Sequence, residues 1–311
     1  MTLTFHFHRR ALLMSVGLGT AALFGATGSG MGAALGLRAP ARLGGIDVER
    51  WGCQYQNIDL AEVARSPLDL IVLDPVVQGI PLTAAQTALL RRKPDGGRRL
   101  VLAYVSIGEA ESYRDYWRAD WREHPPPWLG PENPNWPGSF AVRFWHPAWY
   151  DRLLGPGETL DRVLEAGFDG VFLDRVDAYG DWPDQGIRAQ EAMIALVKAV
   201  SDRGRQRHPG FLVVGQNAEP LLLSRIYLDA IDAVSKESLL YNLRGPGEAN
   251  TEADVQWSLK YLRKAQAHGL PILAIEYADT YFLKMKCRFQ LRKLGMTPFI
   301  GRKMLDTLPI Y

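Results

Sequence analysis

The sequence predicts an α/β protein built as a single (β/α)8 TIM barrel, with an insertion rich in tryptophan and proline after the third strand. Three observations lead to this prediction. From about residue 45 onward, short apolar runs alternate with longer stretches of helical periodicity. The apolar runs are almost uninterrupted, as in parallel strands that are buried on both faces. Eight such units in about 260 residues fit the usual size of a closed barrel.

Each expected strand ends at or just before a polar residue. The strands are expected, in chain order, at residues 48–55, 68–73, 99–106, 170–173, 211–214, 230–235, 272–275 and 297–300. An open, doubly wound parallel sheet is the alternative architecture. That fold needs a glycine-rich phosphate turn after its first strand, and Gln54-Tyr55-Gln56 is not such a turn. The order of the residues therefore favours the barrel.

Four helical stretches between the strands have clear signals. They are expected at residues 83–92, 159–166, 186–201 and 252–268. In the third stretch the apolar side chains recur at helical spacing, as an amphipathic helix requires. The fourth stretch ends before Gly269-Leu270-Pro271, which combines a helix stop with the start of the next strand.

Residues 111–150, between the third and fourth strands, are too many for a simple crossover. They hold six of the nine tryptophans and the run Pro125-Pro126-Pro127. One interpretation is a proline-stiffened flap whose aromatic rings bury one another. The other is a wall of rings over the barrel mouth that stack on the apolar C–H faces of sugars. We expect most of these rings to pack and one or two to stack.

The first 41 residues have the features of an export signal. Arg9-Arg10 precedes an apolar run at residues 11–24, and Ala39-Pro40-Ala41 offers a small-residue cleavage site. The arginine pair indicates the twin-arginine route. We therefore expect a signal peptide at 1–41 and a barrel domain at 45–311. The mature protein is expected in the periplasm or outside the cell, without stable membrane insertion; an uncleaved anchor is the alternative.

Charge argues against a nucleic-acid partner. The signal holds three arginines and no acid, so its removal takes the formal net charge from +2 to −1. The rest of the chain has no cluster of lysine and arginine that resembles a nucleic-acid footprint. The two cysteines, Cys53 and Cys287, could pair in an exported protein. The apolar run around Cys53 favours two buried free thiols instead.

Carboxylates recur where the expected strands end, which is where chemistry sits in this fold. Six acids fall there: Asp74, Glu109, Asp174, Asp177, Glu237 and Glu276. An ion pair or a helix cap would explain one of them, but six exceed that explanation because buried charge is costly unless it is paired. No strand ends in histidine and no G-x-S-x-G motif occurs, so neither a metal site nor a Ser-His-Asp site is expected, and no cofactor. Paired carboxylates alone suit the cleavage of glycosidic bonds.

Four segments give the sequence a family resemblance. They read WGCQYQ at 51–56, VSIGE at 105–109, GFDGVFLDRVDAY at 167–179 and KE at 236–237. Across residues 48–302 the chain resembles glycoside hydrolase family 114, whose members include endo-α-1,4-polygalactosaminidases. The resemblance implies a barrel hydrolase that cleaves an α-1,4-linked, galactosamine-containing polysaccharide within the chain and retains the anomeric configuration.

The resemblance also implies roles for individual residues. Asp174 matches the expected nucleophile, which would be ionised. Glu237 matches the expected general acid/base, which would be protonated, with Glu276 as the substitute candidate. Asp177 and Tyr179 match positions that line the sugar site. We expect further substrate contacts from polar residues in or after the strands, namely Asp74, Tyr104, Glu109, Asn217 and Glu276.

Two other functions remain as alternatives. A non-catalytic carbohydrate-binding barrel would keep the aromatic insertion but would not need a pair of opposed acids. A polysaccharide deacetylase would need a histidine-rich metal site. The expected partner is a polysaccharide, and an acidic barrel mouth favours a cationic sugar such as galactosamine through charge complementarity.

Overall fold

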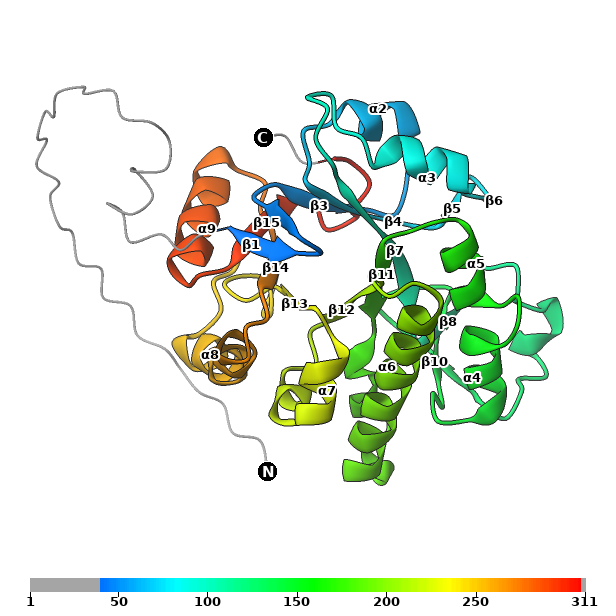
Figure 1. The fold of residues 1–311 in the computed structure, drawn as a ribbon. Coiled ribbons are helices and arrows are strands. Elements are labelled where there is room, and N and C mark those ends of the chain that lie inside the picture. The colour runs from blue at the N-terminus through cyan, green and yellow to red at the C-terminus, as the bar shows by residue number, and fades with distance from the viewer. Residues whose placement is uncertain (1–39, 309–311) are drawn as a thin grey trace, which may run out of the picture. The chain divides into compact units, whose positions relative to one another are not determined.

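The computed structural model describes residues 40–308, so the predicted signal at 1–41 lies almost wholly outside the described residues. Within them, eight parallel strands follow one another in sequence order as a nearly closed barrel with helices around it (Figure 1). This confirms the predicted (β/α)8 architecture. The barrel strands are β3 (Trp51–Gln54), β4 (Leu70–Leu73), β7 (Leu100–Ser106), β11 (Gly170–Asp174), β12 (Leu212–Gln216), β13 (Ala233–Glu237), β14 (Ile272–Tyr277) and β15 (Thr297–Gly301).

Side chains in these strands alternate between the barrel interior and the helix layer, because successive residues of a strand point to opposite faces. Phe172 of β11 and Val214 of β12 belong to the apolar cluster inside the barrel. Their neighbours Val171, Leu173 and Val213 belong to the cluster under the helices. The same alternation decides which acids at the strand ends face the interior.

Helices cover the outside of the barrel (Figure 1). They are α2 (Leu60–Arg65), α3 (Ala84–Leu90), α4 (Pro147–Leu154), α5 (Thr159–Glu165), α6 (Ile187–Arg207), α7 (Arg225–Ala230), α8 (Glu252–Ala267) and α9 (Tyr281–Lys293), with short 3₁₀ helices at Ala119–Arg122, Val176–Asp181, Pro183–Gln185 and Glu219–Leu223. The four predicted helical stretches all form. The third, α6, continues past its predicted end at residue 201.

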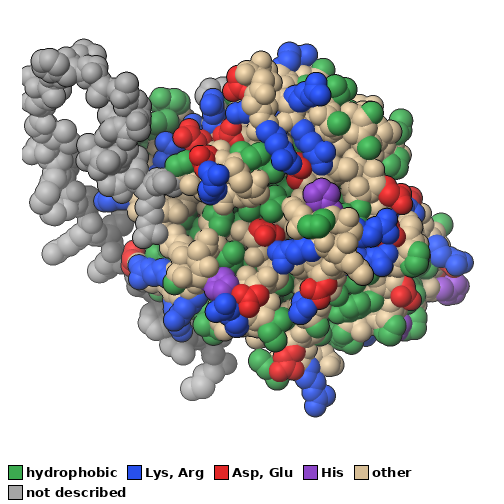
Figure 2. Space-filling view, in the orientation of Figure 1, with side chains coloured by type: hydrophobic (Ala, Val, Ile, Leu, Met, Phe, Trp, Pro, Cys, Tyr) green, Lys and Arg blue, Asp and Glu red, His purple; other side chains and the backbone are tan. Residues whose placement is uncertain are grey.

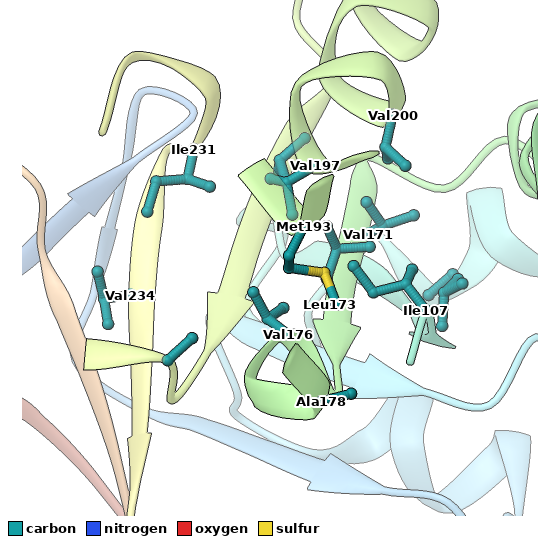
Figure 3. Close-up of a cluster of buried hydrophobic side chains, with 14 of the residues drawn as sticks. Ile107, Val171, Leu173, Val176, Ala178, Met193, Val197, Val200, Ile231 and Val234 are labelled. Atoms are coloured by element: carbon teal, nitrogen blue, oxygen red, sulfur yellow. The ribbon is translucent and has the colours of Figure 1, made fainter. Parts of the chain in front are cut away.

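Helix α6 shows how the outer layer is held. Met193, Val197 and Val200 recur on one face and point toward Val171 and Leu173 of β11 (Figure 3). Each fully buried aliphatic side chain of this kind contributes about 1.5–3 kcal/mol. The strand that ends at Asp174 is thereby fixed from its outer face.

A short hairpin closes the amino end of the barrel. Strands β1 (Ala41–Leu43) and β2 (Ile46–Val48) pair in antiparallel fashion, and Leu43 and Val48 are buried in the interior cluster. At the turn, Gly44 has a φ of +53°, and a Cβ there would lie 3.0 Å from the Leu212 side chain. Only glycine combines this backbone conformation with so close an approach. Strand β1 lies just before residue 45, where the barrel domain is predicted to begin.

The barrel closes along a seam between its first and last strands. The Trp51 indole of β3 donates a hydrogen bond to the carbonyl of Thr297 in β15 at 3.0 Å. The Tyr55 amide donates to the carbonyl of Leu305 at 2.8 Å. The Trp51 and Phe299 rings also meet edge to face. Side chains and a loop amide thus bridge the seam.

The insertion folds as a small sheet beside the barrel. Strands β8 (Glu109–Glu111), β10 (Ser139–Val142) and β9 (Leu129–Glu132) pair in that spatial order, and a two-stranded ribbon, β5 (Val76–Val77) and β6 (Ile80–Pro81), precedes α3. The sequence predicted neither sheet. Neighbouring rings of the insertion form a continuous chain with centroids about 5 Å apart: Trp117, Trp121, Trp128 and Trp149. The prediction that most of these rings pack is confirmed.

Among residues 40–308, no helix has both the length and the apolar character needed to span a bilayer. Acidic and basic side chains are intermingled on the face seen in Figure 2; the absence of a nucleic-acid partner stays a prediction. Cys53 and Cys287 are buried free thiols, as predicted.

Candidate active site

A layer of polar side chains tops the apolar barrel interior at its carboxyl end. Each of these residues lies two positions after an inward-facing residue of its own strand and therefore also faces inward. The pairs are Val72 and Asp74, Leu102 and Tyr104, Phe172 and Asp174, Val214 and Gln216, Ser235 and Glu237, and Ile275 and Tyr277. The second members of all six pairs line one pocket of about 680 Å³. The fold thus brings Asp174 and Glu237 together, as predicted, on strands separated only by β12.

Asp174 lies at the end of β11 in a largely dehydrated setting. Its Oδ2 accepts a hydrogen bond of 2.8 Å from the Tyr104 hydroxyl, and its Oδ1 accepts one of 2.8 Å from the Arg175 amide. Burial raises the pKa of Asp174 to about 7, and the charges of Asp177 and Glu237 act in the same direction, whereas the Tyr104 hydrogen bond lowers it. With a pKa of about 7, Asp174 is ionised only above neutral pH. That it is ionised during the reaction stays a prediction.

Glu237 ends β13 and is held at both oxygens. The Tyr277 hydroxyl donates to Oε1 at 2.6 Å, and the Gln216 amide donates to Oε2 at 2.9 Å. The backbone amide of Glu237 donates to Oδ1 of Asn217 at 3.1 Å. These contacts fix the carboxyl group in position. Both donors to the side chain, Tyr277 and Gln216, are neutral. They can stabilise a negative charge on Glu237, but they do not neutralise it as a cation would.

The chain turns sharply after each of the three strands that carry this machinery. Arg175, Asn217 and Ser238 follow Asp174, Gln216 and Glu237 directly, and all three have φ between 54° and 57°. Left-handed backbone at a residue other than glycine costs about 1–3 kcal/mol and concentrates at functional sites. The turns end each strand immediately after the inward-facing polar residue and leave that side chain at the rim of the pocket.

Two partly buried arginines organise the remaining acids into separate networks. Arg114 joins Asp74 at 2.8 Å and Glu111 at 2.7 Å. Arg175 joins Glu109 at 2.9 Å and also reaches Asp177 and Asp181. Burial raises the pKa of Glu109, and Arg175 opposes the rise. The arginines thus neutralise much of the acidity around the Asp174–Glu237 pair without contacting either of those side chains in an ion pair.

Most of the predicted substrate contacts lie in the pocket. Asp74, Tyr104, Glu109, Asp177 and Asn217 all line it beside the two acids. Trp136, 44% exposed, also lines it, and among the six tryptophans of the insertion it alone does so. The structure shows the position of these side chains; their contact with substrate stays a prediction.

Two predicted site residues lie elsewhere. Glu276 is out of phase with the inward residues of β14, is fully buried, and accepts a hydrogen bond of 2.6 Å from the Leu240 amide. Burial raises the pKa of Glu276 to about 7. Its role is to hold the loop after β13, which corrects the expectation that it contacts substrate or substitutes for Glu237. Tyr179 packs against the outer hydrophobic cluster and does not line the pocket, so its assignment is corrected as well.

Sequence reasoning missed several residues that touch the acid pair or line its pocket. Gln216 and Tyr277 bond to Glu237 directly, and the Tyr55 ring packs on the Tyr104 ring at 4.3 Å. A signal for all three was present, because each lies two positions beyond an inward apolar residue. Arg114, which pairs with Asp74 and Glu111, could not be found in this way because it lies in the insertion and not at the end of a barrel strand.

Among residues 40–308, no group of three or more histidine, cysteine, aspartate or glutamate side chains converges as a metal site would require. That the reaction needs no metal and no cofactor stays a prediction.

The comparison with protein families agrees with this geometry. The sequence pattern that defines glycoside-hydrolase family GH114 matches residues 45–310. The chain belongs to family GH114. Its relatives include two proteins described as uncharacterised. A protein of Deinococcus radiodurans is 36% identical over 84% of this chain and 82% of its own length, and one of Methanocaldococcus jannaschii is 34% identical over 74% of this chain and 66% of its own.

Solved structures agree on the fold of this GH114 chain. The glycoside hydrolase domain of PelA from Pseudomonas aeruginosa superposes with a TM-score of 0.68, covering 85% of this chain and 98% of that domain. Sequence identity is 20%, so the similarity establishes the shared barrel. Membership of GH114 makes the protein a glycoside hydrolase. In enzymes with this barrel fold the catalytic residues lie at the carboxyl end of the strands.

Proposed function

We propose that this GH114 glycoside hydrolase cleaves an α-1,4-linked, galactosamine-containing polysaccharide by a two-carboxylate mechanism. Asp174 acts as the nucleophile and Glu237 as the general acid/base. The observation that carries the proposal is the position of the two acids. Both face inward in the same pocket, and only β12 separates the strands that carry them. Glycosidases use such a pair, in which one carboxylate attacks the anomeric carbon and the other protonates the leaving oxygen.

The charge of the pocket supports a cationic sugar. Six carboxylate side chains line it, against two cationic ones, Arg175 and Lys303. A third cation, Arg114, pairs with two of the six carboxylates, so the acids still outnumber the cations by three. A surplus of negative charge in a concave, partly buried site attracts amino sugars with a free ammonium group. Fully N-acetylated units are neutral and would gain less from it.

The shape of the surface supports cleavage within the polymer. A second hollow of about 820 Å³ shares Trp136, Asn217, Glu237 and Tyr277 with the active-site pocket. The acids therefore lie part-way along a groove and not at its blind end. A groove that continues past the acids accepts a chain that extends beyond the cleaved bond. We infer endo action with retention of anomeric configuration.

Incubation with partly deacetylated galactosaminan tests this proposal. Shorter oligomers should appear, solution viscosity should fall before many reducing ends form, and the first product seen by NMR should be the α-anomer. Release of acetate without chain shortening would indicate a deacetylase. Binding without either product would indicate a non-catalytic barrel. Activity that is lost in a chelator and restored by a divalent ion would overturn the metal-free mechanism.

We also propose that the protein is exported by its amino-terminal segment. The support is Arg9-Arg10 ahead of the apolar run at 11–24. Amino-terminal sequencing of the mature protein should find a start between about residues 25 and 45. An intact Met1 on cytosolic protein would contradict export.

A further inference from the structure

The second hollow of the groove has lining residues that the active-site pocket does not share. It lies between the loop after β13 and the start of α8, and it is lined by Trp257, Asn242, Leu243, Asp254 and Asp279. None of these five residues lines the pocket of the acid pair. We refer to this hollow as the Trp257 hollow.

Trp257 is the feature of this hollow that points to a ligand. Its side chain is 49% exposed although it is among the largest apolar side chains of the molecule. The Tyr261 ring packs against it at 5.1 Å with an interplanar angle of 64°, which fixes its orientation. A rigid, half-exposed indole in a concave surface offers a flat apolar platform, and the C–H face of a pyranose ring is complementary to such a platform.

The loop that walls the hollow is built as a rigid structure. Asn250 donates to the carbonyls of Ser238 and Leu239, at 2.8 and 2.9 Å, and its Oδ1 accepts from the Leu243 amide. Asn242 ties the loop to β14 through the carbonyl of Tyr277 at 3.1 Å. The buried Glu276 accepts the Leu240 amide from below. A wall held at so many points loses little conformational entropy when a ligand binds.

The hollow contains carboxylates that are complementary to the ammonium group of an amino sugar, as the active-site pocket does. Asp279 and Asp254 both line the hollow, and Asp254 also caps α8 through Thr251. Lys303 lines it too, with its ammonium group 5.8 Å from the centroid of the Trp136 ring, in the part that the hollow shares with the active-site pocket. The neighbouring Lys236 is neutralised by Glu219 at 2.9 Å. An ammonium group carried by a sugar on the indole would meet carboxylates here.

We propose that the Trp257 hollow is a distal subsite that binds one hexosamine unit of the polymer, with Trp257 as the stacking platform and Asp279 as the partner of its ammonium group. This inference rests on the proposed function for the identity of the sugar. The subsite makes affinity depend on chain length, since only an oligomer long enough to pass Glu237 reaches it.

Binding to the inactive double variant Asp174→Asn/Glu237→Gln tests the subsite without turnover. In that background Trp257→Ala should weaken binding of an α-1,4-linked galactosamine hexamer about tenfold, and Trp257→Phe should restore most of the affinity. Binding of the dimer should be unchanged. Phe289→Ala removes another half-exposed ring, on α9 outside both hollows, and is the matched control. Asp279→Asn should weaken the hexamer about threefold, and added salt should abolish this difference.

The outcomes separate the subsite from the proposed function. If the parent enzyme shortens galactosaminan but Trp257→Ala binds the hexamer as tightly as its background, the subsite is wrong and the function stands. If the parent cleaves nothing but the hexamer binds in a Trp257-dependent way, the function is wrong and the subsite stands. Equal losses for dimer and hexamer would place Trp257 at the catalytic centre and overturn a distal subsite. Absence of all binding and cleavage overturns both.

Discussion

Two acids at the amino end of the barrel and the acid pair at its carboxyl end are held in different ways. At the amino end, Asp69 pairs with Lys93, and Asp169 pairs with Arg91 and Arg98. At the carboxyl end, Asp174 and Glu237 accept hydrogen bonds from tyrosine hydroxyls, and in the described part of the chain neither forms an ion pair. The amino-end acids are neutralised by cations and connect their strands to the end of α3 and the segment that follows it. Acids that are held by neutral donors keep a charge that chemistry can use.

The largest effect that would test this contrast comes from the carboxyl end. Asp174→Asn and Glu237→Gln keep shape and remove the ionisable group, so each should lower kcat by about 10²–10⁴-fold. Thermal unfolding should change little because no cation is left unpaired. The measurement is turnover on galactosaminan, with circular dichroism to check the fold. A variant with near-parental turnover would remove that residue from the mechanism.

The matching change at the amino end should affect stability instead. Asp169→Asn leaves Arg91 and Arg98 without their shared carboxylate and should cost about 2 kcal/mol in the free energy of unfolding. This is less than for a fully buried pair because Arg98 is largely exposed. Chemical denaturation measures the loss. A fall in kcat without a loss of stability would contradict the division between the two ends.

A third test uses the hydroxyl that holds Asp174. Tyr104→Phe removes a donor that lowers the pKa of Asp174, so that pKa should rise from about 7 by about one unit. If Asp174 is the nucleophile it must be ionised, and the ascending limb of the pH–kcat/KM profile should move to higher pH. Movement of the descending limb instead would make Asp174 the proton donor and exchange the roles of the two acids.

The smallest effect is expected at Glu276. Its buried carboxyl lies outside the pocket, and among residues 40–308 it forms no ion pair. Its pKa in the folded state, about 7, lies above its ordinary value of 4.5. Its protonation therefore stabilises the fold below about pH 4.5, and this stabilisation is lost as pH rises through about 7. Glu276→Gln should keep turnover within about twofold and flatten the dependence of stability on pH across that window. A large loss of turnover would return Glu276 to the list of catalytic candidates.

The success and failure of sequence reasoning at this site have one physical origin. Near-continuous apolar runs located all eight strands, because burial on both faces leaves that pattern. The rule that the acid after a run faces the mouth holds for Asp174 and Glu237. It fails for Glu276 because β14 continues to Tyr277, and counting by twos from Leu273 and Ile275 makes Tyr277 the inward residue.

The insertion was less predictable than the barrel for a different reason. Strand β8 has three residues, and β9 contains Gly130 and Pro131, so neither has strand periodicity of its own. Both exist because β10 pairs with them. Strand preference depends on such partners more than on local sequence. The position of Arg114, which depends on this fold, could not be inferred from a single sequence.

The seam between β3 and β15 bears on how the protein folds and opens. Its Trp51–Thr297 hydrogen bond joins residues 246 positions apart, and loop closure over such a distance is entropically among the last events of folding. The strand pairs β7–β11 and β11–β12 lie in the middle of the sheet. Their strands are separated by far fewer residues in the sequence than β3 and β15 are. Amide hydrogens along β3 and β15 should therefore exchange with solvent sooner than those of β11. Opening there would part the first and last strands while the two acid-bearing strands remain joined through β12.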